Sequence, residues 1–160
     1  MVILLPLAGA LVCFLWPRRS VLWGVVTALG VVACVAGLGW QVMGQGVQRY
    51  AIGSWGAPLG IDLYVDGLSL LMLMMTALVG LGISVYSSGY FDRKTAVVFW
   101  PLWLFLWAAL NALFLSADIF NLYVTLELMG LAAVALVALA GGADALTAAM
   151  RYLLVSLLGS

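Results

Sequence analysis

One acidic residue, Glu127, lies near the middle of the apolar stretch from Ala117 to Gly142. This stretch is long enough to cross a bilayer, because a hydrocarbon core of about 30 Å needs about 20 apolar residues in a helix. A charge at that depth costs from roughly 2.5 to more than 10 kcal/mol, so such residues face other helices or water and commonly serve ion or proton pathways. Glu127 is therefore the first candidate for chemistry, as a proton-handling carboxylate.

Arg151 is the second candidate, inside the last apolar stretch of the chain. At 1.5 Å per residue it lies roughly 10 to 12 Å from the cytoplasmic edge, and Glu127 lies roughly 18 Å from it. A long arginine stem can close such a gap, so we expect an Arg151–Glu127 pair, direct or through water, that offsets both burial costs. Burial favours the protonated acid and a nearby guanidinium favours the carboxylate, so movement of one positive charge would change the protonation of Glu127. A static pair that only fixes helix packing is the open alternative.

The other five carboxylates fall in loops or at the starts of apolar stretches, where we expect water or a helix cap to satisfy them. They are Asp62, Asp66, Asp92, Asp118 and Asp144.

The composition is that of an integral membrane protein, with 67% hydrophobic and only 8% charged residues. The formal net charge is zero and no basic cluster is present, which gives no support to nucleic-acid binding. The sequence has no nucleophile elbow, phosphate loop, dinucleotide fingerprint or Cys/His metal set. We therefore expect no cofactor and no bound metal, and an autonomous enzyme is disfavoured.

Six apolar stretches must position these residues, and we expect an all-α membrane fold of about six transmembrane helices in one region. Their expected ranges are about 2–16, 21–43, 67–88, 95–115, 117–140 and 145–160. The last stretch ends without a polar flank or an anchoring aromatic residue, so we expect a chain that is truncated relative to longer proteins.

The basic residues predict the orientation of the helices. The pairs Arg18–Arg19 and Arg93–Lys94 fall in loops on one side if every stretch crosses the membrane. An excess of basic residues marks the cytoplasmic side, so the N-terminus is predicted to lie outside.

The outer loop from Gly44 to Asp66 predicts a short hairpin between the second and third helices. Residues 61–66 alternate apolar and polar, residues 48–52 do so less regularly, and Gly56-Ala57-Pro58 forms a turn signal between them. Asp66 stands where an N-cap of the third helix is expected.

Polar and aromatic residues of the fourth and fifth helices give further expectations. Trp100 and Trp103 are predicted to lie at the membrane interface, with only Trp107 deep in the bilayer. Asn111 and Asn121 are equally far from the tight turn that joins the helices, so they bond either to each other or each to its own backbone.

The stretch SADIFNLYVTLELMGLAAVALVALAGG, followed by ALTAAMRYLLVSLLGS, resembles the start of a known family. These are the antiporter-like subunits of Mrp-type sodium/proton antiporters, respiratory complex I and membrane-bound hydrogenases, with the D-type subunit of Mrp antiporters as the nearest likeness. Residues 65–91 resemble the third helix of the same family. The resemblance implies a fold of about fourteen helices with two inverted five-helix repeats, of which this chain is the N-terminal part.

The resemblance also implies a function. Glu127 corresponds to the fifth-helix glutamate that takes part in proton transfer, and its further relay partners lie outside this sequence. Most relatives carry lysine where Arg151 stands, and arginine, which is harder to deprotonate, suits charge modulation better than proton relay. The implied protein is a proton- or cation-translocating subunit in the cell membrane, with other membrane subunits, the lipid bilayer, protons and Na⁺ as partners. The rival is a docking subunit without transport of its own; membership of a proton-pumping quinone reductase or hydrogenase stays open.

Overall fold

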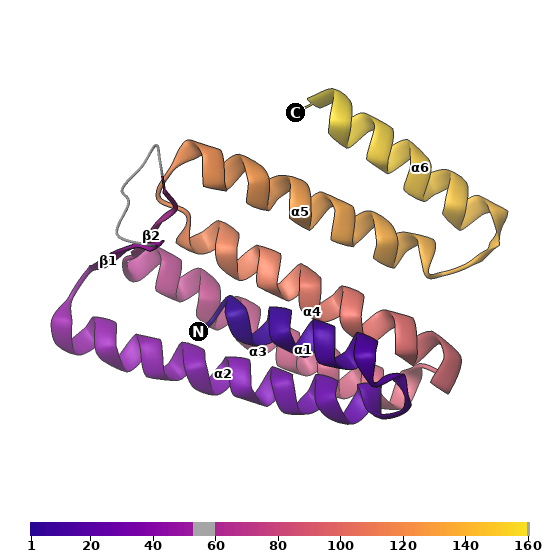
Figure 1. Cartoon of the computed structure of the whole chain (residues 1–160), viewed down its shortest axis with the longest axis horizontal. Coiled ribbons are helices and arrows are strands. Elements are labelled where there is room, and N and C mark those ends of the chain that lie inside the picture. The colour runs from indigo at the N-terminus through magenta and orange to yellow at the C-terminus, as the bar shows by residue number, and fades with distance from the viewer. Residues whose placement is uncertain (53–59, 160) are drawn as a thin grey trace.

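The structure is a computed structural model that describes residues 1–52 and 60–159. In these ranges six α-helices run up and down along one axis, and a two-stranded hairpin lies at one end of the bundle (Figure 1). The elements are α1 (Leu4–Leu15), the 3₁₀ turn η1 (Pro17–Arg19), α2 (Ser20–Gln45), β1 (Gln48–Ala51), β2 (Asp62–Val65), α3 (Gly67–Tyr90), α4 (Arg93–Leu115), α5 (Ile119–Ala138) and α6 (Gly142–Gly159). The predicted all-α membrane fold is confirmed.

Four of the described helical segments are long and apolar enough to cross a membrane. They are Pro17–Gln45, Gly67–Tyr90, Arg93–Leu115 and Ile119–Ala138, whereas α1 is a shorter apolar helix of 12 residues. At 1.5 Å per residue, the 18 residues of α6 extend roughly 27 Å, close to the thickness of the hydrocarbon core.

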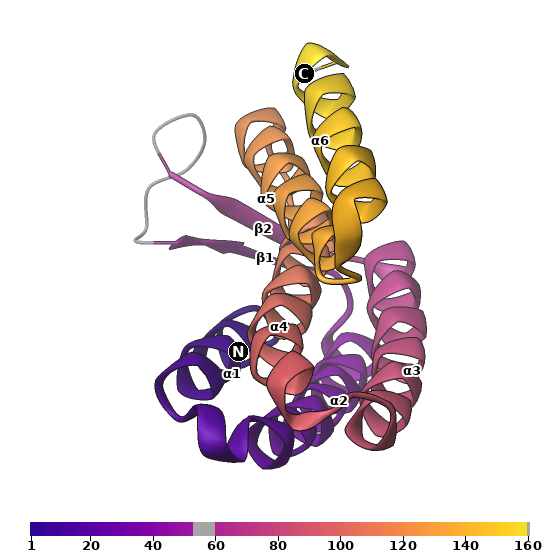
Figure 2. The same ribbon diagram turned by 90° about the vertical axis from the view of Figure 1, so that its right-hand side faces the viewer.

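Helix α4 is the centre of the bundle, and α1, α2, α3 and α5 all pack against it (Figure 2). Two of its indoles fit against glycines of neighbouring helices: Trp100 against Gly24 of α2 and Trp107 against Gly80 of α3. A Cβ atom at Gly80 would lie only 2.7 Å from the Trp107 ring, so glycine is what allows this approach.

The prediction that Trp100 and Trp103 form an interfacial aromatic belt is wrong in that both side chains are buried inside the bundle and do not face the lipid. The Trp103 indole N–H donates to Ser84 Oγ of α3 over 3.0 Å, which satisfies its polar atom inside the bundle. An indole near a helix end suits either an interface or a helix contact, and the rotation of α4 about its axis turns these two inward.

The predicted hairpin is confirmed. Strands β1 and β2 are antiparallel, with Gln48 opposite Val65 and Ala51 opposite Asp62. The proposed turn at Gly56-Ala57-Pro58 lies outside the described residues.

Aspartates cap three helices in succession. Asp66 Oδ1 accepts from the Ser69 N–H at 2.8 Å, as predicted, Asp92 caps α4 through Thr95, and Asp118 caps α5. The hydrogen bond from the Ser69 backbone lowers the pKa of Asp66, and that with the Thr95 side chain lowers the pKa of Asp92.

The three connections that lie away from the hairpin share the opposite end of the bundle (Figure 1). They include the α1–α2 turn with Arg18 and Arg19 and the α3–α4 turn, where Arg93 opens α4. The α5–α6 turn uses Gly141 and Gly142 at φ of 75° and 84°, a left-handed backbone that favours glycine. The side of the membrane that this end faces remains a prediction.

Candidate functional site

Glu127 lies on α5 and lines a hollow of about 430 Å³ between α5 and α6. The carboxylate is half-buried, and among the described residues it has no hydrogen-bond or ion-pair partner. Three hydroxyl-bearing side chains share the hollow with it: Tyr123 of α5, and Tyr152 and Ser156 of α6. A water molecule occupies about 30 Å³ of the liquid, so the hollow has room for several waters beside these four polar groups.

Small residues set how α6 approaches α5. A Cβ atom at Gly130 would lie 3.4 Å from Ser156 Oγ, so Ser156 of α6 lies opposite this glycine of α5. The more buried residues of α6 recur every three or four positions, as expected for one helix face. They are Ala145, Ala149, Leu153 and Ser156.

The structure does not bring Arg151 to Glu127, and no ion pair joins them in the described part of the chain. Arg151 is exposed and lies two residues from both Ala149 and Leu153. At 100° per residue this places it roughly 160° around the helix from the buried face. The pairing of Gly130 with Ser156 also separates Arg151 from Glu127 by roughly 12 Å along the helix axis.

Depth along the membrane could be estimated from the sequence, but the rotation and register of α6 could not. The expected direct contact is therefore not formed between these two described residues. The role of Arg151 as charge partner stays a proposal.

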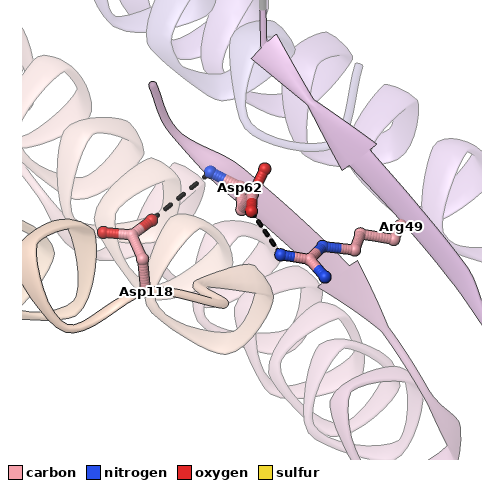
Figure 3. A network of polar contacts seen from close by, with 3 residues as sticks. All are labelled: Arg49, Asp62 and Asp118. Atoms are coloured by element: carbon pink, nitrogen blue, oxygen red, sulfur yellow. Dashed lines mark hydrogen bonds and ion pairs between the residues drawn. The ribbon is translucent and has the colours of Figure 1, made fainter. Parts of the chain in front are cut away.

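An ion pair that the sequence did not predict lies at the hairpin end (Figure 3). Arg49 Nη2 contacts Asp62 Oδ2 at 2.5 Å; the Asp62 side chain is only 2% exposed, whereas that of Arg49 is 66% exposed. The expectation that water or a cap satisfies Asp62 is therefore wrong. The available signal was the presence of opposite charges on the two predicted strands.

Asp62 also connects the hairpin to the start of α5. Its N–H donates to Asp118 Oδ2 at 3.3 Å, and its carbonyl accepts from the Ala117 N–H at 3.0 Å. Asp118 Oδ1 accepts from the Asn121 N–H at 2.6 Å, which caps α5. The hairpin thus holds the N-terminal end of the helix that carries Glu127.

The two asparagines bond neither to each other nor to the backbone of their own helical turns. Asn111 Nδ2 donates to the Val2 carbonyl at 2.9 Å and ties the N-terminus to α4. Asn121 Nδ2 donates to Ser116 Oγ at 2.9 Å in the α4–α5 turn. Equal distance from a turn did not fix which way each side chain faces.

Comparisons with known proteins define the class of this chain. Residues 47–97 match the family described as NADH-ubiquinone oxidoreductase (complex I), chain 5 N-terminus. The chain is 30% identical over 164 residues to the D-type subunit of the Na(+)/H(+) antiporter of Bacillus subtilis (strain 168), which covers 99% of this chain and 33% of that protein. It is 34% identical over 163 residues to the N-type subunit of the NADH-quinone oxidoreductase of Desulforudis audaxviator (strain MP104C), covering 97% of this chain and 32% of that protein.

Two solved structures share the fold. The membrane-bound sulfane sulfur reductase, an archaeal respiratory membrane complex, has a chain that matches with a TM-score of 0.87 at 24% identity, over 96% of this chain and 32% of its own length. The Mrp complex from Dietzia sp. DQ12-45-1b has a chain that matches with a TM-score of 0.82 at 22% identity, over 98% of this chain and 31% of its own length. The chain belongs to the family of antiporter-like membrane subunits, which confirms the resemblance, and it spans about a third of the length of the curated relatives it matches.

Proposed function

We propose that this chain works within a multisubunit complex of the cell membrane as part of a proton- or cation-translocating subunit, and that Glu127 takes up and releases a proton inside the membrane. One observation supports this most directly. Glu127 is a half-buried carboxylate in a hollow with three hydroxyl groups, and no partner among the described residues fixes its charge.

The proposal depends on how a membrane-embedded carboxylate behaves with and without a counter-charge. A carboxylate that is locked in an ion pair stays ionised, whereas one that faces water-sized space and hydroxyl groups can exchange its proton. Tyr152 and Ser156 are suited to hold water next to Glu127, because each hydroxyl both donates and accepts.

The chain holds only part of a proton path. It contains no histidine, and its one lysine, Lys94, is the second residue of α4, at the end of the bundle away from the hairpin, so the other relay groups are proposed to belong to further segments or partner subunits. Arg151 is proposed as a charge that biases the proton affinity of Glu127 from the far face of α6, since arginine stays protonated and does not relay protons.

Protons and Na⁺ are the proposed transported ions, by analogy with the antiporter subunits that the chain resembles.

The rival is a docking subunit in which Glu127 and Arg151 form a static packing pair. The described geometry favours the transport proposal, because the two side chains lie on faces that do not meet.

The test is Glu127→Gln in the assembled complex, with proton movement followed by a pH-sensitive dye in membrane vesicles. We expect a loss of about a hundredfold or more in cation-coupled proton movement, in the range measured for removal of a positioned proton-transfer group. The matched control is Asp144→Asn, which neutralises an exposed carboxylate at the start of α6 and leaves transport unchanged.

Unchanged transport in Glu127→Gln would overturn the proposal. The docking rival predicts instead that Glu127→Ala loses the assembled complex and that Glu127→Leu combined with Arg151→Leu restores it.

A further inference from the structure

A second hollow, of about 410 Å³, lies at the turn between α1 and α2, far from the hairpin. Val12 and Trp16 line it from the end of α1, Arg19 lines it from η1, and Trp23 lines it from the start of α2. The two indoles are 61% and 38% exposed, so both offer free ring surface to whatever occupies the hollow. The site therefore combines an apolar pocket with a cationic rim.

The positive charge at this turn is uncompensated. Arg18 and Arg19 are exposed, and among the described residues neither guanidinium has a hydrogen bond or an ion pair. No aspartate or glutamate precedes Asp62 in the sequence, and Asp62 lies with the hairpin at the other end of the bundle. The turn thus carries two positive charges and no carboxylate of its own.

The turn is held in place by its own hydrogen bonds. The Arg19 N–H donates to the Trp16 carbonyl at 3.1 Å, and the buried Cys13 thiol donates to the Ser20 carbonyl at 3.4 Å. The backbone that carries the residues of the hollow is therefore held in one conformation, which lowers part of the ordering cost of binding.

These features match the chemistry of one kind of ligand. A guanidinium binds a phosphate through paired N–H donors, and indoles at the end of an apolar helix lie at the level of lipid headgroups. An apolar wall such as Val12 suits the glycerol and acyl region below the phosphate. We infer that this hollow binds one anionic glycerophospholipid, with its phosphate at Arg19, its second charge or polar head near Arg18 and its chain between Trp16 and Trp23.

The other basic pair at the same end provides the comparison. Arg93 and Lys94 follow Asp92 directly, and the pKa of that carboxylate is lowered chiefly by its hydrogen bond with Thr95 and to a smaller extent by the Lys94 charge. The local charge there is +1 instead of +2, so the α3–α4 turn serves as a control for diffuse surface attraction.

The experiment is a lipid titration of the full chain in nonionic detergent, read by native mass spectrometry. Phosphatidylglycerol and phosphatidylcholine with the same acyl chains are the probes. We expect one phosphatidylglycerol to bind more tightly than phosphatidylcholine. We expect Arg18→Gln with Arg19→Gln to weaken that binding roughly 25-fold, since each basic side chain near an anionic surface contributes about fivefold. Arg93→Gln with Lys94→Gln is the matched control and retains the preference.

Two further arms keep the result decisive. The double variant Trp16→Leu with Trp23→Leu keeps both positive charges and removes the aromatic walls, so we expect it to lower the affinity for both lipids. Unchanged affinity would mean that the lipid binds elsewhere and would overturn the inference. Inorganic phosphate at millimolar concentration does not displace the lipid, whereas displacement would identify a free-anion site. Two other outcomes also overturn the inference: an equal loss of phosphatidylglycerol affinity in both basic double variants, or no preference for phosphatidylglycerol in the unaltered chain. Circular dichroism checks that each variant keeps its helix content.

Discussion

At the scale of single residues, two carboxylates show how surroundings separate structural from exchangeable charge. Asp62 is buried, paired with Arg49 and joined through its backbone to Asp118 and Ala117. Glu127 is half-buried beside space for water and has no partner among the described residues. The first arrangement fixes a charge in place, whereas no described residue does so for Glu127, and this contrast supports the proposal that Glu127 handles a proton.

We predict that Arg49→Gln lowers the free energy of unfolding by about 1 to 2 kcal/mol, because it removes the ion-pair partner of a buried carboxylate. The cost stays at the lower end because the Arg49 side chain is 66% exposed, where solvent screens the pair. The measurement is thermal unfolding in detergent across a double-mutant cycle with Asp62→Asn. The combined variant should be more stable than the sum of the two single effects predicts, and strict additivity would contradict a direct interaction.

At the scale of elements, features that depend on neighbouring residues were predicted correctly from the sequence. The rotation of each helix about its axis was not. The hairpin and the cap at Asp66 follow from residues only a few positions apart, so the sequence is enough to predict them. The described part of the chain has a helix near each of the six apolar stretches, and four of these helical segments are long and apolar enough to cross a membrane. Which face meets which neighbour depends on contacts between distant segments, and this is why the positions of Arg151 and Trp100 were mispredicted.

The packing of α3 on α4 yields a matched pair of variants on one helix. Gly80→Ala should lower the free energy of unfolding by about 1 to 3 kcal/mol, because the new methyl group would overlap the Trp107 ring. Gly82→Ala, two residues further along α3, meets nothing within 4 Å and should be neutral or slightly stabilising through helix propensity. Thermal unfolding of both variants in the same detergent checks the difference. Equal stabilities would show that α3 does not approach α4 through Gly80.

At the scale of the whole molecule, the two ends of the bundle differ in chemistry. One end holds the hairpin, the Arg49–Asp62 pair and the start of α5, and the other holds three turns with both adjacent basic pairs (Figure 1). Helix α5 is capped at its start by Asp118, and the chain after its end turns at Gly141–Gly142. Glu127 lies between these ends, beside the hollow that α5 and α6 share.

The difference between the ends predicts the orientation, which cysteine labelling of intact cells can measure. In a background with Cys13→Ala and Cys34→Ala, single cysteines are placed at Tyr50 in β1 and at Ala143 near the start of α6, both exposed and uncharged. Because neither change alters the basic residues that set topology, the orientation itself is not disturbed. A membrane-impermeant maleimide should label Tyr50→Cys in intact cells and Ala143→Cys only after the membrane is opened. The reverse pattern would place the N-terminus inside, and equal labelling of both sites in intact cells would contradict the up-and-down crossing, since the two positions lie at opposite ends of the bundle.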